Sequence, residues 1–183
     1  MQLQNATAPL LEEIPADVLV LFHLADEPVP RGRLGRVDWI LLSALSRLRV
    51  RGKFAAERGS SVLLSSGGKF AANWVLVVGL GRRADLTMTA LYRLSYQAAE
   101  TVLRLRQPRI ALDLPLRGFP TEPPVRIRQA FLEGFLAELQ RGWPEASFTV
   151  SLLPPEQGGD WAEEERGKRP QSQNHSRKHR SRE

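Results

Sequence analysis

The sequence predicts an α/β fold: a three-layer α/β/α sandwich in which helices cover both faces of a mixed, mostly parallel β-sheet. Residues 74–78 are an unbroken apolar run, rich in valine and followed at once by glycine, as expected for a strand buried on both faces. Similar short runs alternate with helical patterns along the chain, which favours parallel strands joined by crossover helices. The runs at residues 60–65 and 74–78 follow each other without a helix between them, so one antiparallel pair is expected.

The first half of the domain, which we place at residues 16–153, follows a polar lead-in at residues 1–15. Residues 17–23 are apolar, partly β-branched and followed by proline-containing loop residues, which predicts the first strand. Residues 37–48 place apolar side chains at three- and four-residue steps and therefore predict one amphipathic helix. Asp38 lies near the start of this helix, where a negative charge is favourable. The antiparallel pair comes next, joined through a Gly67–Gly68 turn.

The second half contains two longer helices and two strands. From Met88 the helical spacing of apolar residues is strict as far as Leu105, and Thr87 is a suitable N-cap. The remaining elements are a strand at 109–113, a proline-containing loop at 115–124, a helix at 125–140 and a last strand at 147–153. The predicted order is therefore β-α-β-β-α-β-α-β.

Composition limits the classes of protein to which the chain can belong. Its 183 residues, of which 42% are hydrophobic, are enough for one domain with a core. There is no cysteine, which excludes disulfides and thiolate metal sites. The N-terminus has no basic leader, and no apolar run approaches the roughly 18 residues that a membrane span requires. We therefore expect a cytoplasmic protein without a membrane partner.

The formal net charge of +6 is concentrated at the C-terminus. Residues 166–183 carry seven basic residues and one acidic residue, whereas residues 1–165 carry 19 of each. Because residues 154–183 contain few apolar side chains, we expect a disordered basic tail there. It is either a solubilising tail or a salt-sensitive, non-specific contact site for a polyanion. The cations that would make such contacts are Arg177, Lys178, Arg180 and Arg182.

The glycines after residues 74–78 form the strongest candidate site. Gly79, Gly81 and Ala84 match a relaxed dinucleotide-binding fingerprint between a strand and a helix. Glycines let backbone N–H groups approach a phosphate, and a helix N-terminus and arginines attract it. Asp85 opposes an anion, however, and a tight strand-to-helix turn is the alternative explanation. The candidate ligand residues are Gly79, Leu80, Gly81, Arg82, Arg83 and Thr87.

Other candidate residues favour structural roles. His23 is the only histidine of the domain and ends the first strand, so a packing or hydrogen-bonding role is expected. No nucleophile-elbow motif or Ser/His/Asp set accompanies it. The glycines at 67 and 68 lack the spacing of a phosphate-binding loop and fit a hairpin tip. We therefore predict no catalytic residue, no metal ligand and no cofactor.

Three features taken together resemble the N-terminal domain of leucyl aminopeptidases. They are Gly52-Lys53-Phe54, the hairpin at Gly67-Gly68, and the strand 75–78 ending in Gly79-Leu80-Gly81 before a Thr-initiated helix. The resemblance covers residues 17–113 and extends loosely to 153. It implies a macro-domain-like fold, with the metal ligands and catalytic arginine of the family in a separate C-terminal domain. The Asn-Thr-Asp-Ala-Glu-Gly-Arg signature of that domain does not occur in this sequence.

The resemblance implies a non-catalytic, stand-alone module that associates with itself or with another protein. That partner could be a catalytic aminopeptidase chain, in which case this chain would be a peptidase-related subunit. A small-ligand sensor is the alternative, binding a nucleotide or an ADP-ribose-like phosphate at the Gly79–Arg83 turn.

Overall fold

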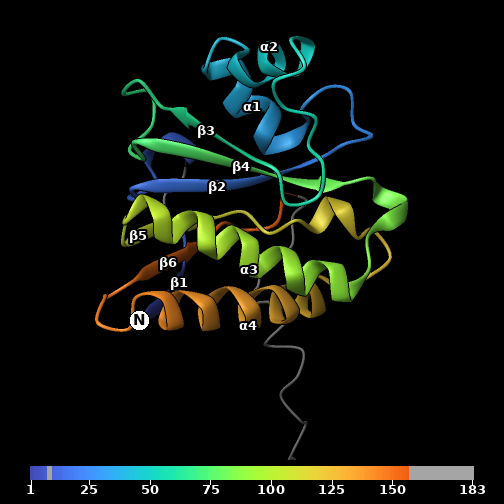
Figure 1. The fold of residues 1–183 in the computed structure, drawn as a ribbon. Helices are drawn as coiled ribbons and strands as arrows, with labels where there is room; N and C mark the ends of the chain where they lie inside the picture. The colour runs from blue at the N-terminus through green and yellow to red at the C-terminus, as the bar shows by residue number, and fades with distance from the viewer. Residues whose placement is uncertain (8–9, 157–183) are drawn as a thin grey trace, which may run out of the picture.

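The computed structural model describes residues 1–7 and 10–156, which form a three-layer α/β/α sandwich (Figure 1). The sheet has the strand order β1-β6-β5-β2-β4-β3. Only the β3–β4 pair is antiparallel, which confirms the predicted mixed, mostly parallel sheet. The strands are β1 (Gln2–Asn5), β2 (Val18–Leu24), β3 (Ser61–Ser65), β4 (Trp74–Gly81), β5 (Arg109–Leu112) and β6 (Thr149–Leu152).

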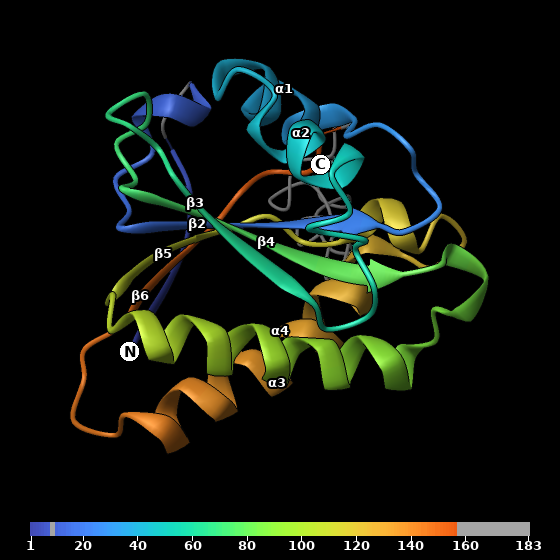
Figure 2. The ribbon, with the colours of Figure 1, turned by 45° about the horizontal axis from the view of Figure 1, so that its top comes forward.

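Helices cover both faces of the sheet, as Figures 1 and 2 show. The two short helices α1 (Gly32–Ile40) and α2 (Ala44–Val50) lie on one face, and the long helices α3 (Met88–Leu105) and α4 (Pro124–Gly142) lie on the other. Short 3-10 helices, η1 (Leu11–Glu13), η2 (Arg83–Asp85) and η3 (Leu116–Gly118), interrupt the loops. Within the described residues, none of the helices is long and apolar enough to cross a membrane.

Alternating side chains of β2 feed two separate cores, as the period of a strand requires. Val18 and Val20 pack against α3 and α4, in a core that contains the fully buried Phe131. Leu19 and Leu21 pack on the opposite face, against α1 and α2. Burial on both faces explains why the central strands appear in the sequence as continuous apolar runs.

The sequence did not predict β1, which lies within the polar lead-in. Gln2–Asn5 is exposed along its whole length and pairs in parallel with β6 at the sheet edge. Its position is fixed by backbone hydrogen bonds, with Gln2 N–H donating to Phe148 O at 2.8 Å and Ala6 N–H donating to Leu152 O at 2.7 Å. An exposed edge strand of this kind has no apolar pattern by which the sequence could indicate it.

The single helix predicted at residues 37–48 was wrong, because the chain forms α1 and α2 with a break between them. Leu42 and Ser43 have φ angles of 55° and 58°, which a right-handed helix cannot accommodate. The buried Asp38 carboxylate accepts hydrogen bonds from Leu45 N–H at 2.8 Å and Ser46 N–H at 3.2 Å. Asp38 therefore caps α2 rather than the start of α1. Both helices face one core, so their apolar spacing continues across the break.

The connections between strands create a crevice at one end of the sheet. From β2 the chain passes through α1 and α2 on one face and reaches β4 by way of the edge strand β3. From β4 it crosses the other face through α3 to β5, which lies on the opposite side of β2. From β5 the chain continues through α4 to β6, which lies on the side of β5 away from β2, so the connections that follow the adjacent strands β2 and β5 run in opposite directions. In open α/β sheets, ligands bind at the carboxyl ends of strands at such a switch point.

Candidate ligand-binding pocket

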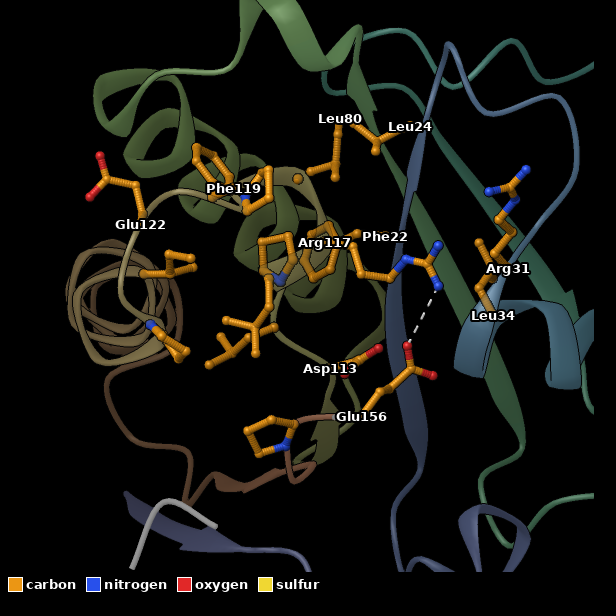
Figure 3. A pocket seen from close by; sticks show the side chains of 18 of the residues that line it. Phe22, Leu24, Arg31, Leu34, Leu80, Asp113, Arg117, Phe119, Glu122 and Glu156 are labelled. Atoms are coloured by element: carbon orange, nitrogen blue, oxygen red, sulfur yellow. Dashed lines mark ion pairs between the residues drawn. The ribbon is translucent and has the colours of Figure 1, made fainter. Parts of the chain in front are cut away.

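A cavity of about 590 Å³ lies at the carboxyl ends of β2, β4 and β5 (Figure 3). This volume is within the range of small-molecule sites. Its apolar lining includes Phe22, Leu24, Leu80, Leu114, Phe119 and Ile127. Its charged lining residues are Glu27, Arg31, Asp113, Arg117, Glu122 and Glu156. The cavity therefore combines apolar walls with a small set of charges.

One wall of the cavity is fixed by tight packing around η3. Phe22, at the end of β2, meets Phe131 of α4 edge to face, with ring centroids 5.3 Å apart. Gly118 lies where a Cβ atom would be 2.9 Å from Leu86 and 3.4 Å from Leu80, so glycine lets η3 approach the end of β4 closely. The prolines of the loop after β5 restrict the backbone further. This wall of the cavity is consequently preformed.

Ion pairs link the loops around the cavity. Arg33 donates to the Asp113 carboxylate and, at 2.8 Å, to the backbone oxygen of Pro154. Arg117 lies between two carboxylates, 3.6 Å from Glu27 and 3.8 Å from Glu156. Among the lining charges, Arg31 is exposed and its side chain has no hydrogen bond or ion pair within the described part of the chain. It is therefore the charge that a ligand can engage without breaking an existing pair.

The pKa of Asp113 is unusually high for an aspartate. Burial at the end of β5 raises its pKa to about 7, and the negative charge of Glu156 adds to the effect, against the opposing attraction of Arg33 and Arg117. The group consequently exchanges its proton near neutral pH, and in its protonated form it donates a hydrogen bond as well as accepting one.

The structure places the predicted glycines inside β4 rather than in a turn that opens a helix. Gly79 N–H donates to Ser60 O at 2.7 Å, and Gly81 N–H donates to Ala56 O at 3.0 Å. Two of the backbone donors proposed for a phosphate thus already have protein partners. Helix α3 begins only at Met88, because η2 intervenes. Close backbone packing explains Gly79 and a φ of 79° explains Gly81, and ligand binding at this segment stays a prediction.

The other residues of the predicted site are divided among several roles. Leu80 lines the cavity, whereas Arg82 is exposed beside a separate shallow depression. Arg83 pairs with Glu27 at 3.2 Å and so ties η2 to the loop after β2. The Thr87 hydroxyl accepts from Ala90 N–H at 3.1 Å, which confirms its predicted role as the N-cap of α3. Within the predicted set, Leu80 alone contributes to the cavity.

His23 is buried on the face of the sheet covered by α1 and α2, in agreement with the expected packing role. Neither ring nitrogen has a hydrogen-bond partner among the described residues, and the same holds for Nη1 of Arg49. Burial lowers the pKa of His23 to about 4, and the positive charge of Arg49 contributes, with Asp38 opposing it. The side chain is therefore neutral at physiological pH.

Sequence reasoning missed most of the cavity. Asp113 follows an identified strand and could have been noticed as a polar group at a carboxyl end. Arg117 and Glu156 belong to loops that approach it only once the strand order is known. Across the described residues, no group of three or more His, Cys, Asp or Glu side chains is arranged to hold a metal ion. Arg177, Lys178, Arg180 and Arg182 lie outside the described residues.

Known proteins resemble the chain in both sequence and fold. A probable cytosol aminopeptidase of Sulfurihydrogenibium sp. is 27% identical over 132 residues, which are 72% of this chain but 26% of that protein. A macrodomain of Mycobacterium tuberculosis DarG superposes with a TM-score of 0.65 at 12% identity, covering 84% of this chain and 98% of its own. A mutant tomato leucine aminopeptidase gives 0.64 at 19% identity, covering 90% of this chain and 34% of its own.

These likenesses confirm the predicted macro-domain-like fold. The chain spans about a quarter of the length of the aminopeptidase that it matches. Residues 19–139 match the model of the N-terminal domain of the cytosol aminopeptidase family, and the chain therefore belongs to that family through this domain.

Proposed function

We propose that the chain is a non-catalytic module that binds an anionic small molecule in the cavity at the ends of β2 and β5. The observation that carries the proposal is the cavity itself, which lies at the topological switch point and has apolar walls. Arg31 supplies a cation without an ion-pair partner in the described chain. A nucleotide or an ADP-ribose-like phosphate combines the anionic and flat apolar parts that such a lining would bind.

Thermal unfolding in the presence of ADP-ribose and a panel of nucleotides tests this function. A ligand present at about 100 times its Kd stabilises the folded protein by about 2.7 kcal/mol, which raises the Tm of a domain of this size by about 5–10 °C. Arg31→Ala is expected to remove most of this shift without changing the Tm of the free protein. Arg51→Ala is the matched control, because Arg51 is an exposed arginine directly after α2 and does not line the cavity.

Two results would contradict the proposal. If the parent protein shows no shift with any compound of the panel, the proposed ligand class is wrong. If Arg31→Ala and Arg51→Ala reduce a shift equally, the ligand binds by general charge attraction rather than in the cavity.

Association with another protein is a second candidate function, supported by the outer surface of α1 and α2. Trp39, Leu42 and Val50 are 78%, 66% and 89% exposed there. Residues 31–53 also carry seven basic residues and only one acidic residue, the buried Asp38. Exposed tryptophan and arginine are the residues that protein interfaces favour. Because two copies would bring like charges together, an acidic partner protein fits this surface better than a second copy.

Size-exclusion chromatography with light scattering tests this association. The chain alone is expected to be a monomer, and a mixture with a catalytic aminopeptidase chain from the same organism is expected to yield a complex. Trp39→Glu with Val50→Glu should abolish the complex, whereas Tyr92→Glu on the exposed side of α3 should preserve it. Absence of a complex with the parent protein would exclude the aminopeptidase chain as the partner.

A further inference from the structure

We propose that the carboxylate of Glu156 occupies the position where the anionic group of a ligand binds, and that an incoming anion displaces it. The inference rests on the proposed ligand-binding function and adds the location of the anion subsite. It also assigns the segment after β6 a role in closing the cavity.

The segment after β6 crosses one side of the cavity. Leu153 N–H donates to Leu112 O at 2.9 Å, and the Pro154 oxygen accepts from Arg33, so the backbone is held as far as this proline. Pro155 and Glu156 then line the cavity (Figure 3). The chain thus delivers a carboxylate into a space that is otherwise shaped for a ligand.

The Glu156 carboxylate lies where two features favour an anion. A Cβ atom added at Gly32 would be 2.2 Å from Glu156 Oε2, so the carboxylate lies directly against the first residue of α1. The N-terminus of a helix carries unpaired N–H groups and a partial positive charge. Arg117 Nη1, 3.8 Å from the same oxygen, approaches from η3. Because Gly32 has no side chain, it leaves space for the anion, and the side chain of a larger residue would fill that space.

The carboxylate is held loosely enough to be exchanged. Charge-assisted hydrogen bonds are normally 2.7–2.9 Å long. Arg117 instead lies 3.6 Å from Glu27 and 3.8 Å from Glu156, and its side chain is 45% exposed. Glu156 also repels the nearby Asp113 carboxylate, since its charge is one of the causes that raise the pKa of Asp113. An anion with more oxygens than a carboxylate could engage Arg117 and the N-terminus of α1 together.

Two dyes that differ in charge test the proposal on the full chain. The first, 8-anilinonaphthalene-1-sulfonate, is an anion with an aromatic body, and N-phenyl-1-naphthylamine is its neutral counterpart. In fluorescence titrations, Glu156→Gln is expected to bind the sulfonate about tenfold more tightly than the parent, because a competing charge is removed. Its affinity for the neutral dye should be unchanged. Arg117→Ala should weaken binding of the sulfonate both in the parent protein and in Glu156→Gln.

Glu122→Gln is the matched control, because Glu122 lines the same cavity but pairs with Arg126 at 2.9 Å. It should alter sulfonate affinity by less than about twofold. Equal gains in Glu156→Gln and Glu122→Gln, or an equal gain for the neutral dye, would overturn the subsite. No sulfonate binding by any variant would overturn both the subsite and the ligand-binding function. The expected dye pattern without a nucleotide-induced thermal shift would retain the subsite and reject only the nucleotide class.

Discussion

Gly79→Ala is expected to destabilise the domain by about 3 kcal/mol, at the upper end of the usual range for overpacking. The new Cβ atom would lie 2.2 Å from Glu57 O, 2.6 Å from the carbonyl carbon of Ala56 and 2.6 Å from Ser60 Oγ. The loop cannot withdraw freely, because Gly59 N–H donates to Gly79 O at 2.9 Å and Gly79 N–H donates to Ser60 O at 2.7 Å. Urea unfolding of the variant and the parent measures the difference.

Gly81→Ala is the control that separates close packing from backbone strain. Gly81 has a φ of 79°, but the nearest atom to an added Cβ is the Arg58 Cβ at 3.3 Å. Strain of a non-glycine residue in the left-handed region costs about 1–2 kcal/mol, so a smaller loss than at Gly79 is expected. If Gly79→Ala costs less than Gly81→Ala, or costs nothing, Gly79 is not required by packing and a ligand role for it regains support.

Much of the fold could be predicted because its determinants are local. The valine-rich run of β4 and the regular spacing in α3 follow directly from burial, and Thr87 was identified as a cap from its position alone. The break at Leu42–Ser43 could not be predicted, because neither residue favours positive φ. It is stabilised by the distant carboxylate of Asp38, whose partners are seven and eight residues away.

The site was predictable only in part, for a related reason. The glycines of β4 were recognised as exceptional, but the need for Gly79 comes from the loop at residues 56–60, which packs on it from outside the motif. The cavity itself combines Phe22, Asp113 and Glu156, which lie far apart in the sequence. Strand order brings these residues together, and it is set by long-range pairing that a local pattern does not encode.

Two titratable groups, the buried His23 and the partly buried Asp113, are expected to give the stability of the domain opposing dependences on pH. The folded-state pKa of His23 is lowered to about 4, below its ordinary value of 6.5, so the unfolded chain binds the proton first. Stability from the neutral histidine is therefore present above pH 6.5 and is lost as the pH falls towards 4. The folded-state pKa of Asp113 is raised from 3.8 to about 7. Its contribution is present below pH 3.8 and is lost as the pH rises towards 7.

The two effects overlap between pH 4 and 6.5, where each amounts to about 3 kcal/mol, so in the parent protein they largely offset each other over this range. In Asp113→Asn only the histidine effect remains. Between pH 4 and 6.5 the free energy of unfolding of this variant should therefore rise by about 3 kcal/mol more than that of the parent protein. His23→Leu should show the opposite slope. Urea unfolding at several pH values gives these slopes. The hydrogen bond from Arg109 lowers the pKa of Asp17, and the resulting contribution of Asp17 is the same in all three proteins. A slope in Asp113→Asn equal to that of the parent would mean that Asp113 ionises normally in the folded protein, and that its burial among Arg33, Arg117 and Glu156 does not hold its proton.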